Sequence, residues 1–299
     1  MTVASAAPGG QVYDRGYRPY EGKRGGRAAV IRALWIASIR RALGLRRSWR
    51  QKLLPWGLLV VVSIPAVVAV GIAYVTRNTP GREFRFITYQ DYVGVSTALL
   101  LFVAITAPDI MCPDRRQRVL PLILSRPLTG LDYVFAKVSA IFTIVFAFGF
   151  LPQVVLFIGR MLVSDSALGY FKGHLDILWK VPVAVAVIAL YYALLGTAAA
   201  ALTTRRVVAA VTFVGVLLVS SVVAHAVVEA GHSRHTLLAL LNLLNLPLHL
   251  RDVIFQGQLG TGSVLSGEPG GAWLTLLEYV GVLAVCTGVL TYRYRWIER

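Results

Sequence analysis

Residues 113–128 read PDRRQRVLPLILSRPL and separate two long apolar runs of the chain. The stretch carries four arginines, yet its middle, residues 119–124, is apolar. A plain solvated loop needs no such apolar turn, whereas a short amphipathic helix that docks on another protein does. We therefore expect 113–128 to be the place where a separate cytosolic protein contacts the chain. A basic loop lying on the lipid headgroups is the alternative interpretation.

The composition is typical of a protein that crosses the membrane several times. The 299 residues are 57% hydrophobic and 15% charged, with a mean hydropathy of +0.67. The charged residues cluster between long uncharged runs, as they do in polytopic membrane proteins. In a soluble protein, a net charge of +16 would indicate nucleic-acid binding. Here the basic residues lie beside the apolar runs, so we expect membrane lipids and not nucleic acid as their partners.

Six apolar segments are long enough to cross a bilayer as helices. They are residues 53–75, 92–108, 138–159, 181–204, 207–228 and 272–292. A further apolar segment, 236–250, is too short to cross and is interrupted by Asn242, Asn245 and Pro247. We expect this segment to re-enter the membrane or to lie on it, on the outer side. The expected fold class is therefore an all-α integral membrane protein, with six transmembrane helices in a domain spanning residues 53–299.

The residues before the first span are expected to lie at the membrane surface. In 27–52, apolar residues that include Trp35 and Trp49 fall largely on one side, and arginines that include Arg40 and Arg41 supply the other. This pattern is typical of an amphipathic interfacial helix. Residues 1–26 form a basic N-terminal arm rich in Gly, Pro and Arg. The arm is either a disordered tail or an ordered segment held by the headgroups or by a partner.

The distribution of Lys and Arg predicts the orientation of the chain. With six spans, 22 of the 30 basic residues fall on the side that holds both termini and residues 113–128. The opposite side holds 8. Cytoplasmic loops carry the excess of Lys and Arg in membrane proteins, so this pattern predicts a multi-pass protein of the cell membrane with both termini in the cytoplasm.

The sequence contains no motif that indicates catalysis or metal binding. No Gly-x-x-x-x-Gly-Lys-Ser/Thr loop is present, so we do not expect the chain to hydrolyse a nucleotide. His232 and His235 form the only close histidine pair, which is more typical of a solvated loop than of a metal site. Cys112 and Cys286 are far apart and make no metal-binding spacing. We expect no enzyme, no catalytic residue and no metal site in this chain.

One acidic residue falls inside an expected span. Glu278 lies about two turns into the segment 272–292. Ionisable groups inside a membrane usually face the interior of a bundle or a water-filled cavity, so Glu278 is a candidate for a carboxylate on a substrate pathway or in helix packing. If the last helix begins later, Glu278 lies at the outer headgroups instead.

Taken together, these features resemble the type-2 ABC transporter permeases. The shared features are an amphipathic N-terminal helix, six spans, a basic turn after the second span and a broken apolar segment before the last. The closest local match is 114–137, where Asp114 takes the place of an acidic residue that the family often shows and Lys137 that of a lysine opening the third span. Residues 122–127 match a Leu-rich turn with Ser-x-Pro, whereas Arg118 and Val119 stand where Gly-Thr is usual.

The resemblance implies a bacterial inner-membrane permease subunit that pairs with a second copy or a close paralogue. It implies two separate ABC ATPase subunits, which would bind the ATP and Mg, and no cofactor in this chain. Residues 113–128 would be the coupling helix, and 236–250 would gate the outer side. The family is mostly exporters, so an amphipathic or apolar substrate is expected to leave along the dimer interface. The expected ATPase-coupling residues are Asp114, Arg115, Arg116, Arg118, Leu122, Ser125 and Arg126.

The main alternative is a non-transporting membrane anchor or scaffold for an ATPase complex. The spans contain little polarity beyond small Ser and Thr residues, which suits an apolar cargo and equally suits no cargo. A membrane-embedded enzyme would need acid, base or metal-binding groups clustered at one face, and the sequence offers none.

Overall fold

A computed structural model of the protein describes residues 25–45, 49–77, 87–93, 96–125, 128–230, 240–260 and 270–295. Within these ranges the regular elements are long helices and short helical turns, with no strand. The helices are α1 (Arg27–Ala42), α2 (Trp49–Thr76), α3 (Tyr89–Val93), α4 (Ser96–Arg116), α5 (Leu120–Leu124), α6 (Gly130–Val163), α7 (Ala167–Gly173), α8 (Leu175–Leu202), α9 (Arg206–Ala230), α10 (Leu246–Gln256) and α11 (Gly271–Arg295).

Six helical segments are long and apolar enough to cross a membrane, which confirms the all-α class and the six expected spans. They correspond to α2, α4 with α3 before it, α6, α8, α9 and α11. The chain is thus of the multi-pass membrane type. Its helices α2, α9 and α11 leave many apolar side chains exposed, as helices that border lipid do.

Helix α4 is longer than the sequence predicts. It continues through Pro108 and Pro113 and ends at Arg116. A proline removes one hydrogen bond of its helix, and neighbouring helices in a bundle can stabilise the turn that this weakens. Residues 113–116, which we expected in the docking segment, therefore form the last turn of a membrane-length helix. The separate helix of that segment is only α5.

Helix α6 begins at Gly130, well before the expected start at residue 138. Thr129 and Asp132 form a capping box: the Thr129 side chain accepts from the Asp132 N–H at 3.3 Å, and the Asp132 carboxylate accepts from the Thr129 N–H at 3.0 Å. Such a pair marks a helix start. Its consequence is that Tyr133 and Lys137 lie inside a helix and not in a loop.

The expected interfacial helix 27–52 is divided. Helix α1 ends at Ala42, and Trp49 begins α2. Gly44 has φ +67°, and the N–H groups of Gly44 and Leu45 bond to the carbonyls of Arg41 and Arg40. This is the Schellman arrangement, in which a glycine in the left-handed region stops a helix. The expectation of one continuous helix was therefore wrong.

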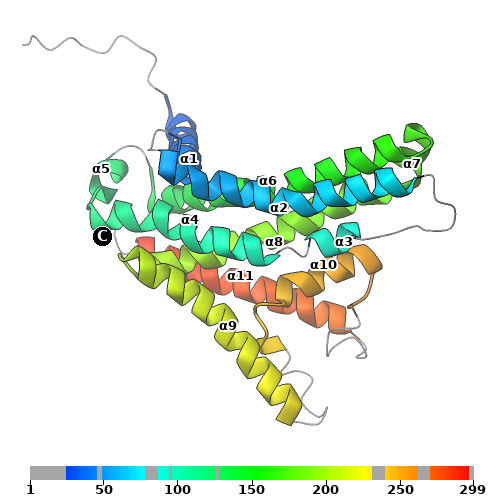
Figure 1. The fold of residues 1–299 in the computed structure, drawn as a ribbon. Helices are drawn as coiled ribbons and strands as arrows, with labels where there is room; N and C mark the ends of the chain where they lie inside the picture. Colours follow the sequence, from blue (N-terminus) through cyan, green and yellow to red (C-terminus); the bar gives the residue numbers. More distant parts are fainter. Residues whose placement is uncertain are drawn as a thin grey trace, which may run out of the picture.

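Helix α8 lies at the centre of the bundle, packed against α4, α6, α9, α10 and α11 (Figure 1). Near its end, residues 196–201 read GTAAAA and are all buried. Small residues allow helix backbones to approach closely in a membrane. At Gly196 the approach is so close that an added Cβ would lie 2.6 Å from a methyl group of Val103 on α4.

The two ends of the bundle differ. Helix α5 lies at the end where the described part of α11 finishes and α9 begins, whereas α3, α7 and α10 lie at the opposite end (Figure 1). The turn before α10 and α10 itself contain the described part of the expected segment 236–250, which begins at residue 240. The apolar run there continues as helix to Gln256, and α10 packs against α8 and α11.

Replacing Gly196 tests the central packing. We expect Gly196→Ala to lower the free energy of unfolding by about 1–3 kcal/mol, because the added methyl group would overlap Val103. Gly281→Ala on α11 is the matched control, since an added Cβ there meets no atom within 4 Å. Thermal unfolding in detergent should show a lower midpoint for the first variant alone, and equal midpoints would contradict the close α4–α8 contact.

Candidate functional site

The candidate site is the end of the bundle that carries α5. After α4, residues 117–119 turn the chain into α5, which has Pro121 in its first turn. Leu120 is buried against the bundle, whereas Leu122 is 71% exposed. The Ser125 hydroxyl donates to the Leu122 carbonyl at 2.9 Å and closes the last turn. The result is a short helix that presents one apolar side chain outward from a basic turn.

The turn before α5 has an unusual backbone at one position. Arg118 has φ +52°, the left-handed region that residues with a side chain rarely adopt. Glycine reaches this region without cost. Position 118 is also the place at which the permease family usually has the glycine of its Gly-Thr pair. The backbone therefore takes, with an arginine, a conformation that glycine would adopt more readily.

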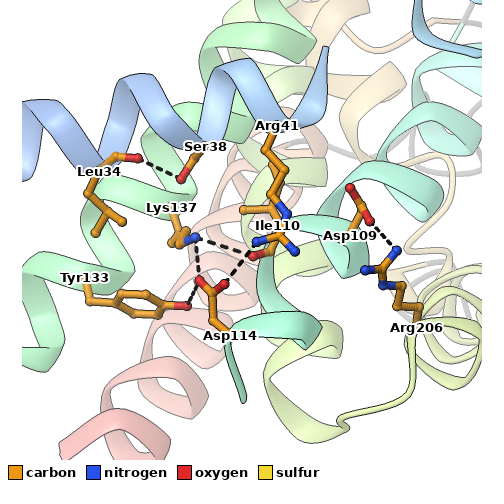
Figure 2. A network of polar contacts seen from close by, with 9 residues as sticks. All are labelled: Leu34, Ser38, Arg41, Asp109, Ile110, Asp114, Tyr133, Lys137 and Arg206. Carbon is orange, nitrogen blue, oxygen red and sulfur yellow. Dashed lines mark hydrogen bonds and ion pairs between the residues drawn. The ribbon is translucent and has the colours of Figure 1, made fainter. Parts of the chain in front are cut away.

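A buried carboxylate lies directly beneath this turn (Figure 2). Asp114, 5% exposed, accepts a hydrogen bond from the Tyr133 hydroxyl at 2.9 Å. Its carboxylate also forms ion pairs with Lys137 Nζ at 2.6 Å and with Arg41 at 3.1 Å. We refer to Arg41, Asp114, Tyr133 and Lys137 as the Asp114 cluster. It joins α1, α4 and α6 at the base of α5.

The Asp114 cluster satisfies groups that would otherwise be costly to bury. Lys137 is also buried, and its ammonium donates to the Ile110 carbonyl at 3.4 Å in addition to its pair with Asp114. A charge withdrawn from water loses several kcal/mol of solvation unless a counter-charge and hydrogen-bond partners replace it. Each charge therefore depends on the other as its counter-charge at this depth.

Further contacts fasten the end of α4 to α8 and α9. The Arg115 guanidinium donates to the carbonyls of Ala201 and Thr203, where α8 ends. Asp109 pairs with Arg206, the first residue of α9, at 2.5 Å (Figure 2). Together with the Asp114 cluster, these contacts connect the last two turns of α4 to four other helices.

Helix α1 is attached to α6 at a second point. Arg27 donates two hydrogen bonds, of 2.8 and 2.7 Å, to the Asp132 carboxylate. These bonds, which favour the charged guanidinium, raise the pKa of Arg27 above its ordinary value. Arg27 and Arg41 stand at the two ends of α1, so the whole helix lies along the start of α6.

The expected ATPase-coupling residues divide into two groups. Arg116, Arg118, Leu122 and Ser125 are exposed around α5, where a partner protein can reach them. Asp114 is buried and Arg115 is partly buried on the end of α8, so their side chains support the turn from inside. Arg126 lies outside the described residues.

The expected membrane-interface residues also divide. Arg40 and Trp49 are exposed and Trp35 is partly buried. Arg41 instead turns inward to Asp114. Nothing in the sequence distinguishes the two residues, because Arg40 and Arg41 are adjacent and alike. The signal for the cluster would have been Asp114, Tyr133 and Lys137, three polar groups spaced along helices that must bury one face.

Glu278 lies in the eighth position of α11, inside the helix, as the expected span places it. It lines a cavity together with residues of α9 and of the turn at 240–243. About two turns further along α11, Cys286 is buried, as Cys112 is on α4. Across the described parts of the chain, no three His, Cys, Asp or Glu residues come together as a metal site would require; His232 and His235 lie outside those parts.

Comparison of the sequence with models of known protein families gives no match, and comparison with curated proteins gives none either. The function has to rest on the geometry at α5 and on the chemistry of the residues around it.

Removing the buried carboxylate tests the role of the Asp114 cluster. We expect Asp114→Ala to lower the free energy of unfolding by about 3–5 kcal/mol, because Lys137 is left buried without its counter-charge. The double variant Asp114→Leu/Lys137→Met, which removes both charges, should recover most of this loss. Denaturation of the purified protein in detergent measures all three values.

The exposed pair of Asp176 and Lys180 supplies the control. Asp176→Ala removes a 3.1 Å ion pair whose carboxylate is 55% exposed, so its effect should stay below about 1 kcal/mol. Equal losses for Asp114→Ala and Asp176→Ala would show that the cluster adds no stability of its own.

Proposed function

We propose that this chain is the permease subunit of an ABC transporter, in which separate ATPase subunits bind at α5 and drive the membrane helices. One observation carries the proposal: a short helix with an exposed leucine projects from one end of a six-span bundle and rests on buried charges that join its helices. The transport direction is proposed to be outward, with an amphipathic or apolar substrate and a second permease copy or paralogue.

The surface of α5 suits a protein partner. Leu122 stands exposed on α5, beyond the ends of the neighbouring membrane-length helices. Arg116 and Arg118 are exposed beside it. An apolar anchor surrounded by arginines is typical of a protein–protein contact, because the anchor fills a pocket while the arginines pair with carboxylates at its rim.

The contacts below α5 suit the transmission of movement. A force on α5 acts on the end of α4, since only three residues separate the two helices. The end of α4 is tied to α1 and α6 through Asp114, and to α8 and α9 through Arg115 and Asp109. Rigid helices joined by ion pairs move together, so closure of two ATPase subunits would shift several spans at once.

The left-handed backbone at Arg118 is a further argument. The sequence departs from the permease family at this position, where glycine is usual. The turn nevertheless has the conformation that a glycine favours. A glycine at this position would suit the turn as it is, which supports the likeness to the family at the proposed coupling segment.

Substitutions on α5 test the ATPase contact. We expect Leu122→Arg and Arg116→Glu to reduce the amount of ATPase that co-purifies with the chain from its native membrane, and to reduce ATP turnover of the complex. Leu168→Arg on α7 is the matched control, because Leu168 is just as exposed but lies at the opposite end of the bundle (Figure 1). Unchanged complex and turnover in both α5 variants would overturn the proposal.

The orientation can be tested by cysteine labelling. Both native cysteines are buried, so a new exposed cysteine gives a readable signal. In intact cells, a membrane-impermeant maleimide should label Leu168→Cys and leave Gln117→Cys unlabelled until the cells are opened. Labelling of Gln117→Cys from outside would place α5 away from any cytosolic ATPase.

A membrane anchor for an ATPase complex is the second candidate, and the tightly packed small-residue core of α8 favours it. An anchor would also bind the ATPase at α5, but it would move no substrate across the membrane. Reconstituted vesicles decide between the two: ATP-dependent movement of a fluorescent amphiphile requires a transporter, whereas ATP hydrolysis without movement favours the anchor.

A further inference from the structure

A cavity of about 640 Å³ lies between α9, the turn at 240–243 and α11. Its size falls within the range of sites that hold drug-sized molecules. Helix α9 packs against α4 and α8, and it diverges from α11 toward the end away from α5 (Figure 1). The cavity occupies the space between α9 and α11 that this divergence leaves.

Two of the cavity walls are held in place by tyrosines. The Tyr191 hydroxyl donates to the carbonyl of Leu243, a lining residue, at 2.8 Å. The Tyr279 hydroxyl, next to Glu278 in sequence, donates to the Val187 carbonyl on α8 at 3.0 Å. The two rings stack with their centroids 5.9 Å apart. Both the turn and α11 are thereby fixed to the central helix, so the cavity has a defined shape.

The lining is apolar except for one carboxylate and two hydroxyl-bearing residues. The Ser220 hydroxyl already donates to the Leu217 carbonyl within its own helix. Among the residues that the structure describes, none hydrogen-bonds to Glu278 Oε1, which is buried, and no Lys or Arg of these residues lines the cavity. A carboxylate withdrawn from water in an apolar site is costly until a positive group pairs with it.

We infer that the cavity binds a lipophilic cation, with the positive group against Glu278 and the apolar body against the face of α9 around Gly215 and Val219. This inference rests on the proposed function, since it names the chemical class of the exported substrate. Anions are disfavoured by the carboxylate. Neutral apolar molecules leave the buried oxygen unpaired, so they bind less tightly than a cation of equal shape.

Tetraphenylphosphonium and tetraphenylborate, which share a shape and differ in the sign of their charge, are suitable probes. The full chain is placed in lipid nanodiscs, and binding is measured by equilibrium dialysis against nanodiscs of the same lipid without protein. We expect saturable binding of tetraphenylphosphonium above the lipid background and none of tetraphenylborate. Equal binding of both ions, or of neither, would overturn the inference.

Two pairs of variants locate the site. Glu278→Gln should weaken phosphonium binding by roughly tenfold or more, because the cation loses a desolvated counter-charge. Glu229→Gln, which removes an exposed carboxylate at the end of α9, should leave it unchanged. Gly215→Phe should abolish binding with Glu278 intact, since an added Cβ there meets open space within the cavity lining. Gly281→Phe, also in open space but away from the lining, should bind as the unaltered chain does.

The outcomes separate this inference from the proposed function. The binding measurement uses the chain alone, so it gives a result whether or not the chain has an ATPase partner. Phosphonium binding that depends on Glu278, in a chain with which no ATPase co-purifies from the native membrane, would refute the transporter and retain the site. An ATPase complex that depends on Leu122, with phosphonium binding that does not depend on Glu278, would retain the transporter and refute the site. If a second copy of the chain fills the cavity instead, Gly215→Phe should disrupt the dimer and the unaltered chain should not bind the cation.

Discussion

The Asp114 carboxylate is the interaction on which the end of this bundle depends. It pairs with an ammonium that has no other acidic partner in the described parts of the chain, and it holds α1 against α6, the third membrane-length helix. Because both partners are buried, neither can be exchanged for water without a large cost. This cost keeps the contact between α1, α4 and α6 rigid. In the proposed function, a rigid contact at the base of α5 transmits the movement of a bound partner to the membrane helices.

The centre and the edge of the bundle are built on different principles. Around the last turns of α8, glycine and alanine let the helix backbones pack closely together. Between α9 and α11 the packing is open, and one acidic group lies in the opening. The proposed transporter needs both properties, because it must transmit force and also accept a substrate. Here they occupy separate parts of the molecule, joined through α8 and the ion pair of Arg206 with Asp109.

The spans were predictable because a membrane helix needs a long apolar run, and such runs are visible in the sequence. Two helix boundaries also have local signals in the sequence, which are weaker than the apolar runs. Gly44 ends α1, and the pair of Thr129 and Asp132 starts α6. The partners of Asp114 were not predictable, since an ion pair across 73 residues depends on how the helices pack and not on any local pattern. For the same reason, the sequence predicts a bundle interior or a cavity around Glu278 but not which helices line it.

The separation of these ion pairs along the chain has a consequence for biosynthesis. Arg41 and Arg27 emerge from the ribosome first, but their carboxylates follow 73 and 105 residues later. Until then these ion pairs cannot form, and other counter-ions must neutralise the arginines of α1. Docking of α1 onto the bundle therefore waits until α4 and α6 have been made, although α1 precedes both in the chain.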